Sequence, residues 1–260
     1  MMYQKVIPLI IQIIEEWERC SMYDVKEFHF NNNECWFRHK CPNFNTEKCN
    51  CACGQYCKFF YLANLANIPK PMQYPENQIL EPGQDKNEYK YLEKIKSNIY
   101  EWVQEGNNLL LYSANFGNGK TTWAIKLMCK YFSEVMYEPD YDFQCRGLFI
   151  NVDEFLYEYK KHMNKKDERF QEILNIIDSV DLVIWDDIGC TKLSDFAHSI
   201  LYPIINTRLI KHKSNIYTTN LIDADLENNI GPRLASRIMN TSDVLEFINA
   251  DKRQPKSRRK

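Results

Sequence analysis

One stretch of the sequence decides the fold: Ser113-Ala114-Asn115-Phe116-Gly117-Asn118-Gly119-Lys120-Thr121-Thr122. It follows the apolar run at 109–112 and precedes a helix-like pattern at 123–128, so it is expected to join a strand to a helix. Gly117 and Gly119 allow the backbone to curl until successive N–H groups point inward. Because the helix N-terminus adds positive potential at the same place, the stretch is predicted to bind phosphate groups.

Two side chains at the end of this loop supply further contacts to a nucleotide. Lys120 is predicted to bridge the β- and γ-phosphates, and the Thr121 hydroxyl to bind Mg²⁺. Ala114 stands where the usual pattern has its first glycine, which an alanine tolerates only with a negative φ. A glycine turn without a ligand is the alternative, and the flanking strand and helix argue against it. The residues predicted to bind the nucleotide are Asn115, Phe116, Gly117, Asn118, Gly119, Lys120, Thr121 and Thr122.

A second apolar strand, at 182–185, runs into two carboxylates. In a parallel sheet it delivers these acids to the same edge as the phosphate-binding loop. Asp186 is predicted to hold Mg²⁺, directly or through water. Asp187 is predicted to polarise the attacking water, since adjacent residues at a strand end point in different directions. The loop and the acid pair together indicate nucleotide hydrolysis more strongly than either does alone.

Two further motifs add polar groups to the predicted site. The strand at 215–219 is followed by Asn220, which is expected to position the hydrolytic water beside the γ-phosphate. A turn-favouring asparagine at a strand end is the alternative. Arg233 and Arg237 stand at i and i+4 and so face the same way on a helix. Such a guanidinium can reach the γ-phosphate held by a neighbouring subunit, and a surface salt bridge is the alternative.

Composition sets the class of protein. The chain has 260 residues, 44% of them hydrophobic and 26% charged, which is ordinary for a globular protein with a sizeable core. The formal net charge of −2 means that any binding to nucleic acid must come from local clusters. The apolar run at 6–14 is too short to span a bilayer, lacks a signal-peptide cleavage site and runs into acids. We therefore expect a cytoplasmic protein with no membrane partner, in a reducing compartment.

Cysteines are concentrated near the N-terminus: six of the ten lie between 35 and 57. In a reducing compartment, clustered thiols indicate a metal more than disulfides. The segment has few aliphatic residues and is a poor candidate for a self-sufficient core, so a structural Zn²⁺ is expected to stabilise it. An Fe–S cluster and unliganded thiols are the alternatives. Four zinc ligands are expected from the set Cys35, His39, Cys41, Cys49, Cys51, Cys53 and Cys57.

Composition also divides the chain into four parts. Residues 1–68 are predicted to form a small, helical and irregular zinc-binding domain. An apolar helical face within 1–30 either packs on that domain or docks on a partner. Residues 69–85 carry four prolines and are predicted to be a linker. Residues 86–250 mix helical and strand patterns and are predicted to form an α/β domain, and residues 251–260 are a basic tail.

Within the α/β domain, periodicity locates the expected elements. Helices are expected at 86–105, 120–133 and about 195–212, with another opened and capped by Asp153 and Glu154 and a further one at 232–238. Strands are expected at 109–112, 148–152, 182–187, 215–219 and 244–247. Residues 160–169 are a basic helix face or loop. A solvated surface is the commoner explanation for such a run, and a contact to a phosphate backbone is the functional one.

The order of these motifs resembles the AAA+ ATPases of the DnaC/DnaI helicase-loader family. The resemblance covers the α/β domain and implies an AAA+ core with a parallel sheet between helices and no C-terminal lid domain. It implies ATP and Mg²⁺ as ligands, Asp186 and Asp187 as the second acidic motif, and weak or partner-stimulated hydrolysis. Asn220 is then the first sensor. Arg237 is implied as the arginine finger in preference to Arg233. The motifs concerned are the phosphate-binding loop, Ile184-Trp185-Asp186-Asp187-Ile188-Gly189, Tyr217-Thr218-Thr219-Asn220-Leu221 and Gly231-Pro232-Arg233-Leu234-Ala235-Ser236-Arg237-Ile238.

The resemblance also implies partners. A zinc-bearing N-terminal domain is similar to the DnaI-type arrangement, in which that domain binds the replicative hexameric DNA helicase. The implied function is ATP-controlled loading of this helicase onto single-stranded DNA by a nucleotide-dependent homo-oligomer. Residues 160–169 and the basic tail would then contact the DNA backbone. Two alternatives remain: an IstB-type AAA+ transposition helper, and a zinc-dependent helicase-binding adaptor whose nucleotide site does not hydrolyse ATP.

Overall fold

The fold is built on a five-stranded, entirely parallel sheet in the order β2-β3-β4-β1-β5. This confirms the predicted α/β class. The strands are β1 (Asn108–Tyr112), β2 (Gly147–Asn151), β3 (Leu182–Asp186), β4 (Ser214–Thr219) and β5 (Asp243–Glu246). The computed structural model describes residues 43–49, 63, 66–69, 72–73, 80–135, 145–162, 168–221 and 223–251.

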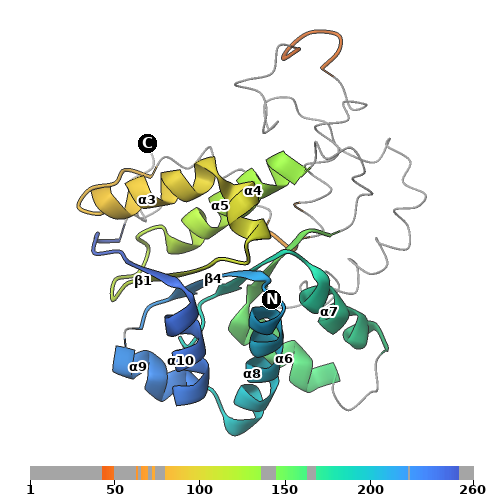
Figure 1. The fold of residues 1–260 in the computed structure, drawn as a ribbon, viewed down its shortest axis with the longest axis vertical. Helices are drawn as coiled ribbons and strands as arrows, with labels where there is room; N and C mark the ends of the chain where they lie inside the picture. Colours follow the sequence, from red (N-terminus) through yellow and green to blue (C-terminus); the bar gives the residue numbers. More distant parts are fainter. Residues whose placement is uncertain are drawn as a thin grey trace, which may run out of the picture.

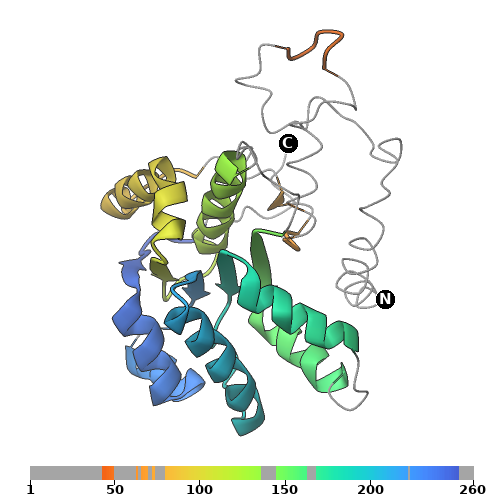
Figure 2. The same ribbon diagram turned by 45° about the vertical axis from the view of Figure 1, so that its right-hand side comes forward.

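Helices cover both faces of the sheet, so the domain has three layers (Figures 1 and 2). One layer consists of α3 (Lys86–Ser97), α4 (Ile99–Gln104) and α5 (Lys120–Val135). The other consists of α6 (Val152–His162), α7 (Glu168–Ser179), α8 (Asp195–Ile210), α9 (Asp223–Ile230) and α10 (Pro232–Thr241). Within the described ranges, none of these helices combines the length and apolarity needed to cross a bilayer.

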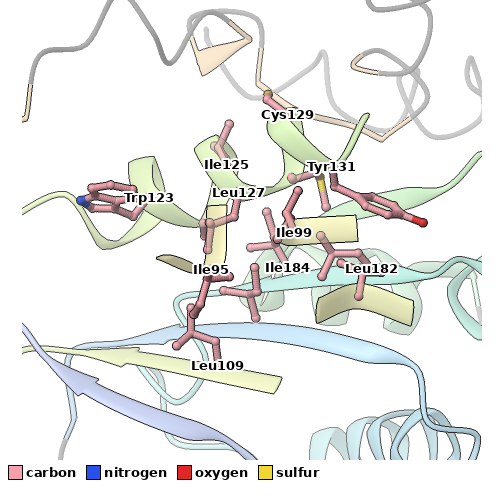
Figure 3. Packing of buried hydrophobic residues seen from close by; sticks show 14 of the residues in the cluster. Ile95, Ile99, Leu109, Trp123, Ile125, Leu127, Cys129, Tyr131, Leu182 and Ile184 are labelled. Carbon is pink, nitrogen blue, oxygen red and sulfur yellow. The ribbon is translucent and has the colours of Figure 1, made fainter. Parts of the chain in front are cut away.

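The central strands are buried on both faces, as expected for a parallel sheet covered by helices. On β1, Leu109 and Leu111 belong to the core under α3 to α5, while Leu110 between them belongs to the core under α6 to α10. Figure 3 shows Leu109 and Ile184 of the sheet facing the α5 side chains, among them Leu127. Burying each of these leucines stabilises the domain by roughly 1.5–3 kcal/mol.

The end of the sheet away from the phosphate-binding loop is held by a buried arginine. Arg208, on α8, is 0% exposed and uses all five N–H groups of its guanidinium. Burial lowers its pKa to about 10, so it remains charged at neutral pH. It joins the end of α7 to the residue just before β3 and to the first residues of β4. Its acceptors are Asn215 Oδ1 (2.8 Å), Ile177 O (2.5 Å), Val180 O (2.9 Å), Asp181 O (3.4 Å) and Ser214 O (2.7 Å).

Several predicted boundaries were wrong by small amounts. The helix expected at 86–105 is interrupted at Asn98, where the side chains of Ser97 and Asn98 bond back to carbonyls of the preceding turn. The helix after β2 begins at Val152, and its cap is Asn151 Oδ1, which accepts from Glu154 N at 3.1 Å, so the prediction of an Asp153–Glu154 cap was wrong. Helices α7 and α9 were not predicted.

A short segment at the predicted boundary between the first domain and the linker packs on the α/β core. Ala63, Ala66 and Ile68 are buried in the core under α3 to α5. The carbonyl of Ala66 accepts from Phe149 N at 2.7 Å on β2, the edge strand of the sheet. Residues 66–68 are therefore attached to the α/β core itself. The division of the chain at 68 and 85 stays a prediction.

Candidate nucleotide-binding site

The phosphate-binding loop lies between the carboxyl end of β1 and the start of α5. At this point the chain leaves β1, crosses over and continues at β2 on the far edge, which is where open α/β sheets bind ligands. Ser113 anchors the loop from beneath. Its buried hydroxyl donates to the carbonyl of Phe247 and accepts from the side chain of Asn118 and from Asn115 N, the last at 3.0 Å.

The two glycines of the loop meet both a conformational and a steric requirement. Gly117 has a φ of 68° and Gly119 a φ of 102°, which other residues rarely adopt. A Cβ atom on Gly119 would lie 3.2 Å from the Leu80 side chain, and one on Gly117 would collide with the Asp251 carboxylate. Ala114 is not among the described residues with positive φ, as its place in the pattern predicted.

Lys120, the first residue of α5, is buried with 6% of its surface exposed. Its ammonium donates to three neutral oxygens: Asn220 Oδ1 at 2.7 Å, Asn115 O at 3.3 Å and Asn118 Oδ1 at 3.3 Å. These contacts bring the lysine of the loop together with the polar residue that follows β4. An ammonium held by weak neutral acceptors is suited to exchanging them for phosphate oxygens, with which its bonds are charge-assisted.

Thr121 and Asp186 also meet, because α5 begins beside the carboxyl end of β3. Thr121 Oγ1 donates to Asp186 Oδ1 at 2.7 Å. Burial, followed by the charge of Asp187, raises the pKa of Asp186 to about 6, so the carboxylate is ionised at neutral pH. Hydrogen bonds from Thr121 and Thr218 and the charge of Lys120 oppose that rise. A hydroxyl and a carboxylate at a helix N-terminus are hard oxygen ligands and fit Mg²⁺ beside a triphosphate.

Asp187 and Asn220 complete the predicted constellation. Asp187 follows β3 directly and has a φ of 58°, a left-handed conformation that is uncommon outside glycine. The Asn220 side chain uses both of its ends: Oδ1 accepts from Lys120 and Nδ2 donates to Cys190 Sγ at 3.5 Å. Burial and the charge of Asp187 raise the pKa of Cys190 to about 11, so it is a neutral thiol. The predicted loop, acid pair and sensor therefore lie together at one edge of the sheet.

The remaining predicted nucleotide contacts differ in their surroundings. The Asn115 side chain donates to Ile248 O at 3.2 Å and to Asn249 O at 3.3 Å, which ties the loop to the segment after β5. Phe116 is 63% exposed at the tip of the loop. Thr122 is half-buried on the first turn of α5.

The two arginines lie on α10 and point away from its buried face. Arg233 and Arg237 are exposed, while Leu234, Ala235 and Ile238 pack into the core. Within the described part of the chain neither guanidinium forms an ion pair or a side-chain hydrogen bond. The surface salt bridge considered as an alternative is therefore not found among these residues. Among the described residues, neither arginine contacts Lys120.

The predicted zinc site falls almost wholly outside the described residues. Cys49 is described and is a free thiol. No group of three or more His, Cys, Asp or Glu side chains that could hold a metal occurs within the described ranges. The zinc ion stays a prediction. The candidates that lie outside the described residues are Cys35, His39, Cys41, Cys51, Cys53 and Cys57.

Three residues at the site were not predicted. Ser113 holds the loop from below, Cys190 contacts Asn220, and Thr218 bonds to Asp186. Thr218 lies within the strand motif and is buried, so its position before Asn220 was a usable signal. The other two contact partners far away in sequence, which local patterns do not reveal.

A phosphate-binding loop after β1 and an acid pair at the end of β3, on a five-stranded parallel sheet, define a P-loop ATPase core of the AAA+ type. The chain belongs to the family of IstB-like ATP-binding proteins, whose model matches residues 81–258. No curated protein matches its sequence.

Solved structures agree on the fold. A crystal structure of the DnaC helicase loader has 19% identity and a TM-score of 0.56, covering 66% of this chain and 95% of that one. A crystal structure of DnaI has 19% identity and a TM-score of 0.54, covering 72% and 94%. AMPPCP-bound DnaA from Aquifex aeolicus has 21% identity and a TM-score of 0.52, covering 67% of this chain and 49% of that one. The predicted AAA+ core and its resemblance to the DnaC/DnaI type are confirmed.

Proposed function

We propose that this protein is an ATP-controlled loader of the replicative DNA helicase onto single-stranded DNA. The nucleotide-binding part of this proposal rests on two contacts, Thr121–Asp186 and Lys120–Asn220. Together they join three strand ends into one site. The loading function is supported by the match to nearly the full length of a DnaC helicase loader. The motif order, with the Asp-Asp-Ile-Gly segment, supports the same conclusion.

Each residue of the site has a distinct role in this proposal. Lys120 exchanges its three neutral oxygens for phosphate oxygens, and the N–H groups around Gly117 and Gly119 surround the phosphates. Mg²⁺ held by Thr121 and Asp186 would neutralise charge on those phosphates.

Hydrolysis requires two further side chains. Asp187 lies beside the Mg²⁺ ligand but outside the strand, and its carboxylate polarises the attacking water. Asn220 turns its amide from Lys120 toward the γ-phosphate and orients the same water. Because Asn220 contacts the lysine before nucleotide binds, its release reports on the presence of the γ-phosphate.

Arg237 is proposed to act on the site of a neighbouring subunit, since it is exposed on α10 and its guanidinium forms no ion pair or side-chain hydrogen bond within the described part of the chain. We expect Arg237→Ala to keep its nucleotide affinity within about twofold and to lose roughly 10³-fold in assembly-stimulated hydrolysis. Measuring ATP turnover at rising protein concentration, with nucleotide affinity measured separately, checks this. If assembly-stimulated hydrolysis is unchanged in this variant, either Arg233 is the arginine finger or the chain has none among these two residues.

Mixed assemblies make that test sharper. Asp187→Asn subunits retain Arg237 but lack the carboxylate, whereas Arg237→Ala subunits retain a complete site of their own. If the arginine acts across the interface, mixing the two inactive variants restores part of the turnover. A mixture as inactive as its components would contradict action in trans.

A surface on α6 is proposed to contact single-stranded DNA. Tyr157 is 68% exposed, and the exposed Lys160 and Lys161 follow it by three and four residues, so all three lie on one side of the helix. An aromatic ring beside cations is the chemistry that binds unpaired bases and their phosphates. Lys161 also forms a 3.9 Å ion pair with Glu158.

We expect the double variant Lys160→Ala/Lys161→Ala to bind single-stranded DNA more weakly. Because two ammonium groups no longer neutralise phosphates, the slope of log K against log salt becomes less steep by about 1.4. Fluorescence anisotropy of a labelled oligonucleotide at several salt concentrations measures it. Lys90→Ala/Lys94→Ala is the matched control, because both lysines are exposed on α3 on the opposite face of the sheet. Equal slopes for both variants would count against this surface.

Co-purification with candidate replicative helicases, with and without ATP, tests the loading function itself. Nucleotide-dependent capture of a helicase supports the proposal. Capture of a transposase in place of a helicase would instead indicate a transposition helper. Helicase capture with no measurable turnover, in the wild type and in Asp187→Asn alike, would indicate an adaptor with a non-hydrolysing site.

A further inference from the structure

Thr218 lies on β4 two residues before Asn220 and is 0% exposed. Its hydroxyl donates to Asp186 Oδ1 at 2.8 Å and accepts from Asp187 N at 3.0 Å. We propose that Thr218 is a positioning residue that sets both acids of the site, the Mg²⁺ ligand and the carboxylate that polarises water. This inference rests on the proposed ATPase function and assigns Thr218 a part in it.

The backbone at Asp187 needs such a support. A left-handed conformation is uncommon at a residue with a side chain, and neighbouring contacts of the turn are needed to hold it in one arrangement. Thr218 supplies two of those contacts. Besides the bond from Asp187 N to its hydroxyl, its carbonyl accepts from Ile188 N at 2.9 Å. One residue of β4 therefore fixes two successive N–H groups of the turn that aims Asp187.

The bonding capacity of the hydroxyl explains why a threonine is suited here. A hydroxyl has one hydrogen to donate, and Thr218 donates it to Asp186. A lone pair of the same oxygen accepts the hydrogen bond from Asp187 N. Asp186 Oδ1 also accepts a hydrogen bond from the hydroxyl of Thr121. The Thr121 hydroxyl is the one expected to bind Mg²⁺. When Thr121 is engaged by the metal, Thr218 remains as the donor that keeps the carboxylate in place.

The same strand end also reaches the other half of the site. Asn220 contacts Lys120 at 2.7 Å, so β4 touches the acids through Thr218 and the phosphate-binding lysine through Asn220. A shift of this strand end would change both halves together. The hydroxyl of Thr218 is thus in a position to affect metal-dependent binding and turnover without touching the nucleotide.

The test compares Thr218→Val, which keeps the shape and loses the hydroxyl, with Thr218→Ser, which keeps the hydroxyl. The affinity for ATP is measured with Mg²⁺ and with a chelator, and kcat and KM are measured separately. We expect Thr218→Val to lose most of the tightening that Mg²⁺ gives and to lower kcat by about 10²-fold, with affinity in chelator unchanged. Thr218→Ser is expected to recover both within about threefold.

Controls separate positioning from general stability. Ser214→Ala removes a buried hydroxyl from the other end of β4, where Oγ donates to Val103 O at 3.1 Å, and it should leave the Mg²⁺ effect intact. If Thr218→Val does not fold, Thr218→Ala removes the same hydroxyl without any steric demand and replaces it in the comparison.

The outcomes distinguish this inference from the function on which it rests. A wild-type Mg²⁺ effect and kcat in the hydroxyl-free variant would overturn the role of Thr218 and leave the ATPase intact. Equal losses in Thr218→Val and Thr218→Ser would overturn it as well, because the hydroxyl would then not matter. A wild-type protein that binds no nucleotide would overturn the proposed function itself.

Discussion

Replacing Lys120 by alanine is expected to abolish nucleotide binding, raising the Kd for ATP by about 100-fold or more. The ammonium is buried and holds three neutral oxygens that phosphates are expected to replace. Loss of two charge-assisted bonds of about 1.5 kcal/mol each gives a change of this size. Titration calorimetry or a fluorescent ATP analogue measures it directly.

The matched control is Lys130→Ala on the same helix. Lys130 is partly exposed and pairs with Glu134 one turn further along α5. Its replacement removes one positive charge from α5, as Lys120→Ala does, but at a position away from the loop. ATP affinity in this variant is expected to stay within about twofold of wild type. A similar loss in both variants, or none in Lys120→Ala, would show that the loop is not the nucleotide site.

The largest expected effect on stability is that of Arg208→Met. Methionine fills much of the space but donates no hydrogen bond, so three buried backbone carbonyls and one part-buried one lose a charged partner. Asn215 Oδ1 loses one donor as well and keeps the other, Trp185 Nε1 at 3.1 Å. We expect the free energy of unfolding of the ATPase domain to fall by about 3–5 kcal/mol, measured by urea denaturation.

Two further variants identify the cause of that loss of stability. Arg208→Lys keeps the charge but offers fewer donors in another geometry, so it is expected to remain clearly destabilised. Arg233→Met removes an exposed guanidinium and should change stability by no more than about 0.5 kcal/mol. A domain equally stable with methionine at 208 and at 233 would contradict the importance of the buried network.

Much of the fold was predictable because the chemistry is local. The loop at 113–122 and the apolar strand ending at Asp186 locate two of the five strands and the crossover between them. Strand order was not predictable, since the pairing of β1 with both β4 and β5 depends on contacts between distant segments. Helix α9 was not predicted because its eight residues are mostly polar, and among those whose burial is described only Leu226 and Ile230 are buried.

The residues of the candidate site also differ in how far the sequence predicts them. Lys120, Thr121, Asp186 and Asn220 follow from motifs with strict local spacing, and the structure places them in contact. Residues that act through a partner far along the chain have no such local pattern. Arg208 illustrates the difference, because an arginine within an apolar helix shows no sign that it joins two strands and the end of another helix.

The central claim is that Lys120, Thr121 and Asp186 bind a nucleotide together with Mg²⁺. The most direct measurement is the affinity for ATP with Mg²⁺ and with a chelator, in the wild type and in Asp186→Asn. We predict that Mg²⁺ tightens binding at least tenfold in the wild type, about 1.4 kcal/mol, and less than about twofold in the variant. Equal tightening in both proteins, or no binding by the wild type, would contradict the claim.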